Sequence, residues 1–148
     1  MVTAQNLLYS VAAARRILGI YYPEIKVVIQ VWAKVILVIS DGRRPRFISK
    51  RVFKQHFVDR RRQEAKALKV MSEGYHVFTV TNPKKGSQYR VTSKNDAIYC
   101  ECEDYKNQLS FWDKAACKHS YAVLFNMGYS ELSQYLRIDH KIPATVFA

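Results

Sequence analysis

Cysteine and negative charge are both scarce in this sequence of 148 residues, which has three Cys, and 12 Asp and Glu against 24 Lys and Arg. Three cysteines cannot all pair, and Cys100 and Cys102 are too close in sequence to form an unstrained disulfide. No signal-peptide pattern is visible where the sequence begins. A disulfide-stabilised fold is therefore disfavoured.

The carboxylates form no cluster suited to the catalytic magnesium of a nuclease. The sequence also offers no recognisable combination of general base, nucleophile and oxyanion donor. Both absences predict that the protein is not an enzyme.

Long apolar runs are missing as well. The run from Ile25 to Ile39 is interrupted by Lys26, Gln30 and Lys34 and is too short to span a bilayer. There is no internal repeat, low-complexity segment or clear linker, and 49% hydrophobic residues exclude a disordered chain. We expect a folded cytoplasmic protein without a membrane partner, with a nucleoid-associated or nuclear location as the alternatives.

Positive charge is abundant instead, with a formal net charge of +12. Such an excess favours a polyanionic partner, and nucleic acid is the first candidate. Two other interpretations stay open: the charge only keeps the protein soluble, or it binds a membrane surface.

The three cysteines are arranged with one histidine as Cys100-x-Cys102 and, after a spacer, Cys117-x-His119. Side chains alternate along a strand, so Cys100 and Cys102 would point the same way. Cys117 and His119 can share one ion only if Cys117 lies at or before a helix start and His119 in the first turn. Helix N-terminal amides would then favour the Cys117 thiolate.

Three thiolates and one imidazole are the usual closed ligand set of structural zinc, so we predict a Zn²⁺ site. Buried free thiols beside a chance histidine, or a Cys–His nucleophilic pair, are the alternatives. An iron–sulfur cluster fits less well because it usually takes four cysteines.

The same residues resemble a known family. C-x-C, a spacer, and C-x-H opening an apolar helix (Cys117 to Leu124) are similar to the SWIM-type zinc finger, and the resemblance covers about residues 75–127. Two preceding strands and the acidic-aromatic step Glu103-Asp104-Tyr105 fit as well. The resemblance implies a zinc site, association with DNA and with proteins, and no catalytic role.

The first half of the chain predicts a helix, a hairpin and a second helix. Apolar spacing predicts an amphipathic helix over residues 6–18 that ends at Gly19. Residues 35–39 are apolar on both faces, which favours a strand buried on both sides, and the residues around Ala33 hold either a bulge or a turn. Asp41-Gly42 predicts a hairpin that returns into residues 46–48.

A long basic helix is then predicted over residues 52–72, closed by Gly74. Its apolar stripe is interrupted in the middle by Arg60, Arg61 and Glu64. Either Arg60 pairs with Glu64, or this part of the face is solvated or meets a partner.

The second half predicts a β-meander over residues 75–81, 88–92 and 98–100, which delivers the first ligand pair. An apolar helix should follow from Cys117 to about residue 127, and a short helix should run from Ser130 to Leu136 before a docked or frayed tail. In the spacer, Leu109, Phe111 and Trp112 could pack over the metal or stack on unpaired bases.

The predicted fold class is therefore α+β: an N-terminal helix, a small antiparallel sheet, a long basic helix, and a zinc finger made of a meander and a helix. We divide the chain into residues 1–74, the finger at 75–128 and a C-terminal part at 129–148, which together are expected to form one compact unit.

Candidate phosphate contacts concentrate between Arg43 and Lys69, where eleven Lys and Arg face only two acidic residues. The alternative is a hydrated basic surface. With lysines of the first meander turn and of the finger, the complete candidate set is Arg43, Arg44, Arg46, Lys50, Arg51, Lys54, Arg60, Arg61, Arg62, Lys66, Lys69, Lys84, Lys85, Lys114 and Lys118.

The sequence thus predicts a zinc-dependent nucleic-acid-binding protein. DNA is favoured over RNA because of the family resemblance and because no RNA-binding signature is visible. The alternative is a protein-interaction adaptor, or an accessory subunit of a larger nucleic-acid-processing complex.

Overall fold

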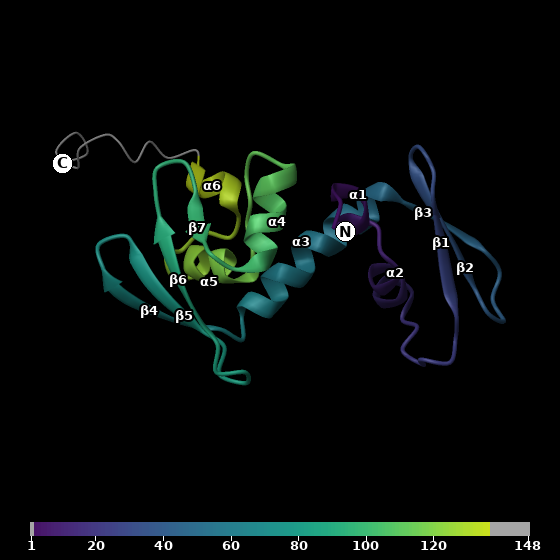
Figure 1. Cartoon of the computed structure of the whole chain (residues 1–148), viewed down its shortest axis with the longest axis horizontal. Helices are drawn as coiled ribbons and strands as arrows, with labels where there is room; N and C mark the ends of the chain where they lie inside the picture. The colour runs from purple at the N-terminus through teal and green to yellow at the C-terminus, as the bar shows by residue number, and fades with distance from the viewer. Residues whose placement is uncertain (1, 137–148) are drawn as a thin grey trace. The chain divides into compact units, whose positions relative to one another are not determined.

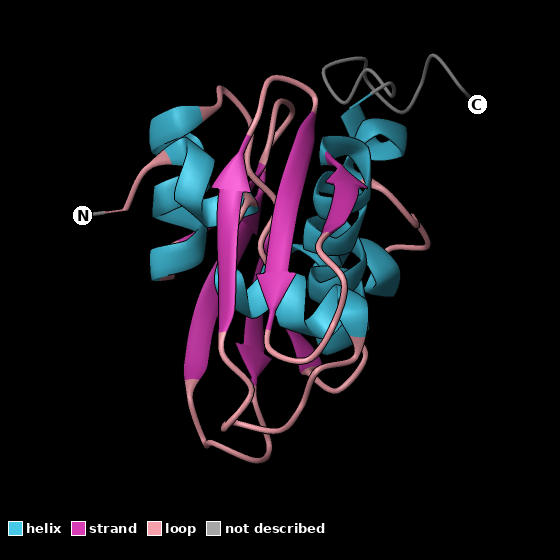
Figure 2. Cartoon of the chain, turned by 90° about the vertical axis from the view of Figure 1, so that its right-hand side faces the viewer, coloured by secondary structure: helices cyan, strands magenta, loops and turns pink. Residues whose placement is uncertain are grey.

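The fold is mixed α+β with two separate antiparallel sheets, as the computed structural model shows for residues 2–136 (Figure 1). Strands are magenta and helices cyan in Figure 2. The chain forms two compact units, which we name unit 1 and unit 2, and the division falls between Arg60 and Arg61. The predicted tail at 137–148 lies outside the described residues. Within residues 2–136, no helix has the length and apolar character needed to cross a bilayer.

Unit 1 contains two short helices, a three-stranded sheet of order β1-β2-β3 and the first part of a longer helix. Its elements are α1 (Ala4–Leu8), α2 (Val11–Leu18), β1 (Val27–Val31), β2 (Val35–Ser40), β3 (Arg46–Ser49) and α3 (Lys50–Ala65).

The single helix predicted at 6–18 is wrong, because two separate N-caps divide this segment. The Thr3 side chain caps α1 in a capping box with Asn6, and the Ser10 hydroxyl accepts from the backbone N–H of Ala13 at 3.0 Å to start α2. The predicted stop is confirmed: Gly19 follows α2 in the left-handed region at φ 70°.

The segment around Ala33 is a turn between two strands, which resolves the alternative between a bulge and a turn. The backbone N–H of Trp32 donates to the carbonyl of Val35 at 2.9 Å and closes it. Only one face of β2 is fully buried: Ile36 and Val38 are 0% and 1% exposed, whereas Ile39 is 39% exposed. The expectation that 35–39 is buried on both sides is therefore wrong, because helices cover one face of this sheet.

The core of unit 1 lies on that covered face. Phe53 of α3 is fully buried and meets Tyr9 edge to face at a centroid distance of 5.8 Å. Small residues of α2, Ala13 and Ala14, allow close packing against Ile36 and the rest of the cluster.

The long basic helix predicted at 52–72 is also wrong in its second half. α3 ends at Ala65, and residues Lys69–Gly74 form β4, which pairs with β5 through Val70 and Val80. Helical propensity is a weak preference, and the hydrogen bonds of a sheet edge override it here. Met71, which lay within the predicted helix, is 65% exposed on β4.

Unit 2 contains the second sheet, of order β4-β5-β6-β7, and the helices that pack on it. Its further elements are β5 (Val77–Thr81), β6 (Gln88–Ser93), β7 (Ile98–Cys100), α4 (Glu103–Phe111), α5 (Lys118–Asn126) and α6 (Leu132–Leu136). The predicted meander is confirmed in order and pairing. Helix α4 was not predicted.

Helix α5 crosses the whole second sheet and contacts all four strands. Its residues Val123 and Leu124 are fully buried with Val80 and Val91 of the sheet. The first turn of α5 lies beside β7, because the Ser120 hydroxyl donates to the carbonyl of Ile98.

Candidate metal centre

The candidate metal ligands come from three elements that meet in unit 2. Cys100 is the last residue of β7, and Cys102 is the N-cap of α4. Cys117 is the N-cap of α5, and His119 lies in the first turn of that helix. The structure brings all four residues together. Cys117 at the helix start and His119 in the first turn have the arrangement that the sequence predicts for this pair.

The four ligand atoms form a small buried cluster. All lie within 4.8 Å of one another, and the four residues are between 0% and 6% exposed. His119 presents Nδ1, which is 3.7 Å from the Sγ atoms of both Cys100 and Cys117.

These distances match a metal-centred cluster. With Zn–S of about 2.3 Å and Zn–N of about 2.0 Å, tetrahedral angles put sulfur and nitrogen about 3.5 Å apart. A direct hydrogen bond explains the geometry less well, because Nδ1 has one proton or one lone pair and can serve only one of two sulfurs. One central cation satisfies every ligand at once, so the donor set fits a tetrahedral zinc.

Two helix N-termini point at the sulfurs. The backbone N–H of Tyr105 donates to Cys102 Sγ and that of Ser120 donates to Cys117 Sγ, both at 3.4 Å. Amides of a first helical turn stabilise negative charge, so each N–H favours the thiolate form of its sulfur when a cation is bound. The sequence predicted this contribution for Cys117 but missed it for Cys102, because α4 was not foreseen.

Without a metal ion the three sulfurs share negative charge unequally. The thiols of Cys100 and Cys117 donate to Cys102 and hold the pKa of Cys102 far below its usual range. The same hydrogen bond with Cys102 raises the pKa of Cys100 to about 12, and burial raises the pKa of Cys117. The cluster is thus ready to exchange protons for a cation.

A buried amide holds the two ligand-bearing loops together. Gln108 of α4, 4% exposed, accepts from the backbone N–H of Ala116 at 3.0 Å and donates to the carbonyl of Ala116 at 3.1 Å. Ala116 immediately precedes Cys117, so this bidentate contact fixes the start of the Cys117–His119 segment relative to the helix that Cys102 caps.

An ion pair extends this network to α3. Arg61 makes a bidentate contact with Asp104, with both nitrogen–oxygen distances 2.8 Å, and Asp104 also accepts from the Gln108 amide at 3.1 Å. Sequence reasoning missed the roles of Asp104 and Gln108. A signal was present, because an acidic residue in the first turn of a helix and a Gln four residues later lie on one face.

Other buried groups complete the surroundings. The Ser120 hydroxyl donates to the carbonyl of Ile98 at 3.1 Å and lies 3.3 Å from Cys117 Sγ, which ties α5 to β7. The Tyr89 ring lies 4.5 Å from the imidazole of His119 in a tilted arrangement, with an interplanar angle of 42°. Tyr105 is buried with no hydrogen-bond partner for its hydroxyl among the described residues, and this desolvation raises its pKa to about 12.

The spacer aromatics are less buried than the packing prediction requires. Leu109 is 42% exposed, while Phe111 and Trp112 are half-buried and contact each other edge to face at 6.2 Å. The ring that contacts a candidate ligand, His119, is that of Tyr89 in β6.

The candidate phosphate contacts are distributed over both units. Most are exposed: Arg43, Arg44, Arg46, Arg51, Lys54, Arg60, Lys66, Lys69, Lys84, Lys85 and Lys114. The half-buried ones are Lys50, Arg61, Arg62 and Lys118. Lys50 lies over the Tyr9 ring at 5.2 Å, and Arg61 is held by Asp104.

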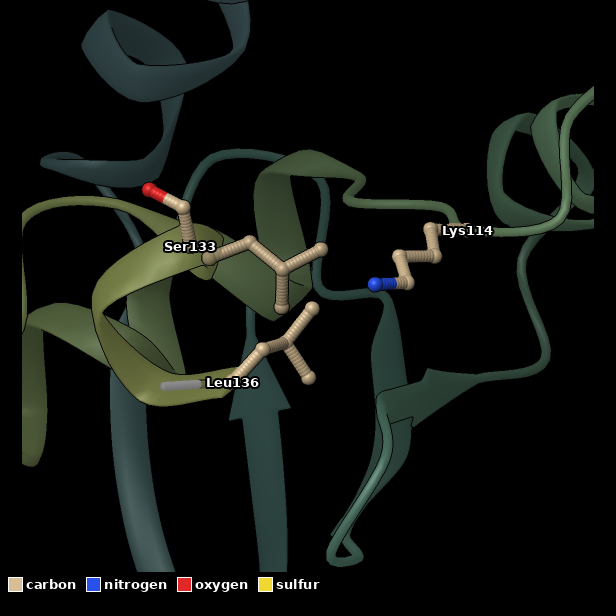
Figure 3. A pocket seen from close by; sticks show the side chains of 4 residues that line it. Lys114, Ser133 and Leu136 are labelled. Atoms are coloured by element: carbon tan, nitrogen blue, oxygen red, sulfur yellow. The ribbon is translucent and has the colours of Figure 1, made fainter. Parts of the chain in front are cut away.

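Lys114 borders a cavity of about 410 Å³ between the α4–α5 loop and α6. Figure 3 shows its amino group directed toward Leu136, which lines the cavity with Leu132 and Ser133. An exposed amino group over apolar side chains gives no specific indication of a ligand.

The positive charge is concentrated in unit 1, which contains none of the cysteines. Residues 1–60 carry eleven Lys and Arg against three Asp and Glu, a formal charge of +8. Residues 61–148 carry thirteen against nine, a formal charge of +4. The unit without the cysteines is therefore the more basic one.

Comparison with known proteins assigns no family: no family model matches the chain, and no match is found among curated proteins or among solved structures. What the geometry supports is that unit 2 holds a buried Cys₃His cluster able to bind a metal ion, which is consistent with a zinc finger.

Proposed function

We propose that this protein binds zinc and nucleic acid, with DNA favoured over RNA. In this proposal a structural zinc finger of the SWIM type stabilises unit 2, and a positively charged surface contacts phosphates. The single observation that carries the proposal is the convergence of Cys100, Cys102, Cys117 and His119 in a chain of net charge +12.

The ligand set supports a structural rather than a catalytic metal. Four protein ligands fill a tetrahedral zinc and leave no position for water or substrate. All four residues are buried, and the surrounding hydrogen bonds join secondary-structure elements instead of lining an opening.

For the metal, elemental analysis of protein purified without chelator tests the proposal. We expect about one zinc per chain, as one tetrahedral site requires. Protein with intact fold and no bound metal would contradict the finger.

The charge distribution supports the nucleic-acid part of the proposal. The β2–β3 turn and the start of β3 carry Arg43, Arg44 and Arg46, all exposed. Exposed Arg and Lys that neutralise phosphates release counterions, so binding weakens steeply with salt. Such contacts position a protein on nucleic acid without reading its sequence.

A fluorescence-anisotropy salt series with labelled DNA and RNA probes tests this part. Wild-type protein should give a log–log slope corresponding to several neutralised phosphates, and replacing Arg43, Arg44 and Arg46 by Ala should reduce the magnitude of the duplex slope by about 2–3. Lys106→Ala, an exposed cation outside the candidate set, is the control and should change the slope by at most about 1. Salt-independent binding, or no binding to either polymer, would contradict the proposal.

A protein-interaction adaptor is the second candidate function. One observation favours it: Val28, Trp32 and Phe47, all in unit 1, expose large apolar side chains to solvent. Exposed apolar groups of this size mark protein interfaces as well as ligand surfaces.

A further inference from the structure

The sheet of unit 1 has one face that no described helix covers. We name it the outer face and define it by strand alternation and register, because residues paired across strands point to the same side. Its members are Val28, Gln30, Trp32, Val35, Leu37, Ile39, Phe47 and Ser49. The opposite face carries Ile36, Val38 and Ile48, which are buried in the core.

The outer face is apolar and exposed. Val28 and Phe47 are each 57% exposed and Trp32 is 48% exposed. An antiparallel sheet with one buried face normally presents polar side chains on the other. Because this face of β2 is apolar, the sequence wrongly predicted that the strand is buried on both sides. An exposed apolar face of this kind marks a surface for a binding partner.

Two aromatic rings are the centre of this face. Trp32 directly follows β1 and Phe47 lies in β3, and the centroids of their rings are 4.9 Å apart with an interplanar angle of 71°. Since β2 lies between these two strands, the two rings meet across β2. The pair therefore forms an aromatic surface that remains about half exposed.

Cations lie at both ends of the outer face. Lys34 belongs to the β1–β2 turn next to Trp32, and Arg43 and Arg44 belong to the β2–β3 turn at the other end. Lys26 extends β1 at that second end, where its backbone N–H contacts the Asp41 carboxylate at 3.3 Å. These exposed cations suit a partner with regularly spaced negative charges and flat apolar groups.

We propose that the outer face binds single-stranded nucleic acid, whose bases stack on Trp32 and Phe47 while its phosphates contact the cations at the two ends. This inference rests on the proposed function and names its substrate class. Base stacking needs exposed π faces, which a single strand supplies and a duplex hides. Sheet faces that bear aromatic residues bind single strands in this way in a common recognition module.

Other partners fit the face less well. A second copy of this chain would bring two units of formal charge +8 together and place like charges at both ends of the interface. A protein partner needs apolar area but no aromatic ring. A variant that keeps the apolar area and removes the ring, Phe47→Leu, therefore distinguishes the two kinds of partner.

Intrinsic fluorescence tests the stacking directly, because the chain has two tryptophans and Trp32 is one of them. Full-length zinc-loaded protein with Trp112→Phe leaves Trp32 as the reporter. Adding oligo(dT) should quench this emission, and high salt should reverse the quenching. Duplex DNA at equal phosphate concentration should quench much less.

Anisotropy with a labelled oligo(dT) on otherwise wild-type protein measures the contribution of each ring. Trp32→Ala or Phe47→Ala should weaken single-strand binding between about five-fold and about 150-fold, and duplex binding should change by less than about two-fold. Phe47→Leu keeps apolar area and removes the ring, so it should behave like Phe47→Ala. Tyr75→Ala, which removes an 88% exposed aromatic from unit 2, is the matched control and should have no effect.

The outcomes separate the two proposals. If wild-type protein binds neither polymer, both the proposed function and this inference fail. If it binds nucleic acid, but Trp32 is not quenched and the ring variants bind oligo(dT) like wild type, only this inference is overturned. If Phe47→Leu binds oligo(dT) like wild type while Phe47→Ala loses binding, apolar area rather than base stacking on the ring supports the binding, and the inference is overturned. Self-association of wild type that Phe47→Ala abolishes, or binding to anionic lipid vesicles but not to oligo(dT), would also overturn it.

Discussion

The hydrogen bonds of Gln108 give the sharpest test of how the metal centre is built. Its amide satisfies both backbone groups of Ala116, which is 9% exposed, and also contacts Asp104. Gln108→Ala removes these partners and leaves the N–H and the C=O of Ala116 unpaired. Each unpaired buried group costs ~1–3 kcal/mol, so the two together should lower the free energy of unfolding of the zinc-loaded protein by ~2–6 kcal/mol.

This loss should appear as weaker zinc binding. In small metal-dependent domains folding and binding are one equilibrium, so the whole cost reduces the apparent affinity. A cost of ~2–6 kcal/mol corresponds to a loss of zinc affinity of about 30-fold to about 25,000-fold. If unit 2 keeps its fold without metal, the loss of zinc affinity should be about 10-fold to 100-fold, which is typical when a residue that supports a metal ligand is removed.

Competition with a chromophoric chelator at pH 7.4 measures the zinc affinity, and urea unfolding of the zinc-loaded protein measures the free energy. Gln63→Ala is the matched control, because Gln63 is an exposed helical glutamine. If Gln108→Ala binds zinc within about three-fold of wild type and unfolds at the same urea concentration, the argument that this amide holds the ligand loops is wrong.

Three further predictions follow from the same structure. Chelation of the metal, or Cys102→Ser, should unfold unit 2, because zinc contributes an apparent ~10–16 kcal/mol in small fingers; unchanged circular dichroism would contradict a structural role. Zinc binding should release protons and therefore strengthen as the pH rises, which calorimetry in buffers of different ionisation enthalpy can measure. About two protons should leave at pH 7 if unit 2 keeps its fold without metal, because the pKa values of Cys100 and Cys117 are raised and that of Cys102 is lowered. About three should leave if unit 2 unfolds without metal, because all three cysteines are then ordinary thiols. Phe53→Ala should cost ~3–5 kcal/mol of stability, because the ring is fully buried, whereas the 43% exposed Val52→Ala should cost under ~1 kcal/mol in the same urea assay.

Local sequence patterns predicted the structure correctly where one residue determines the backbone conformation. Gly19 ends α2 in the left-handed conformation that glycine adopts without strain, and the turn containing Asp41-Gly42 joins β2 and β3 as predicted. The meander at 77–100 follows from alternating strands and turn residues. In each case the determining interaction lies within a few residues of the chain.

Local sequence patterns gave the wrong prediction where contacts with distant parts of the chain determine the secondary structure or the burial. The residues at 69–74 continue a helical pattern but pair with β5, and the segment at 103–111 becomes a helix that Cys102 caps. The outer face of the first sheet could not be told from a buried one, because an apolar side chain in a strand does not reveal whether anything covers it.

The sequence by itself determined three features of this protein: the identity of the candidate metal ligands, the Cys117 position at a helix start and the excess of positive charge. These follow from residue type and spacing. Only the tertiary structure decided how the metal centre is held, through Gln108, Asp104 and Arg61, and which apolar residues remain exposed on the sheet of unit 1. The physical reason is that hydrogen-bond partners and burial depend on segments far apart in sequence, which meet only in the folded chain.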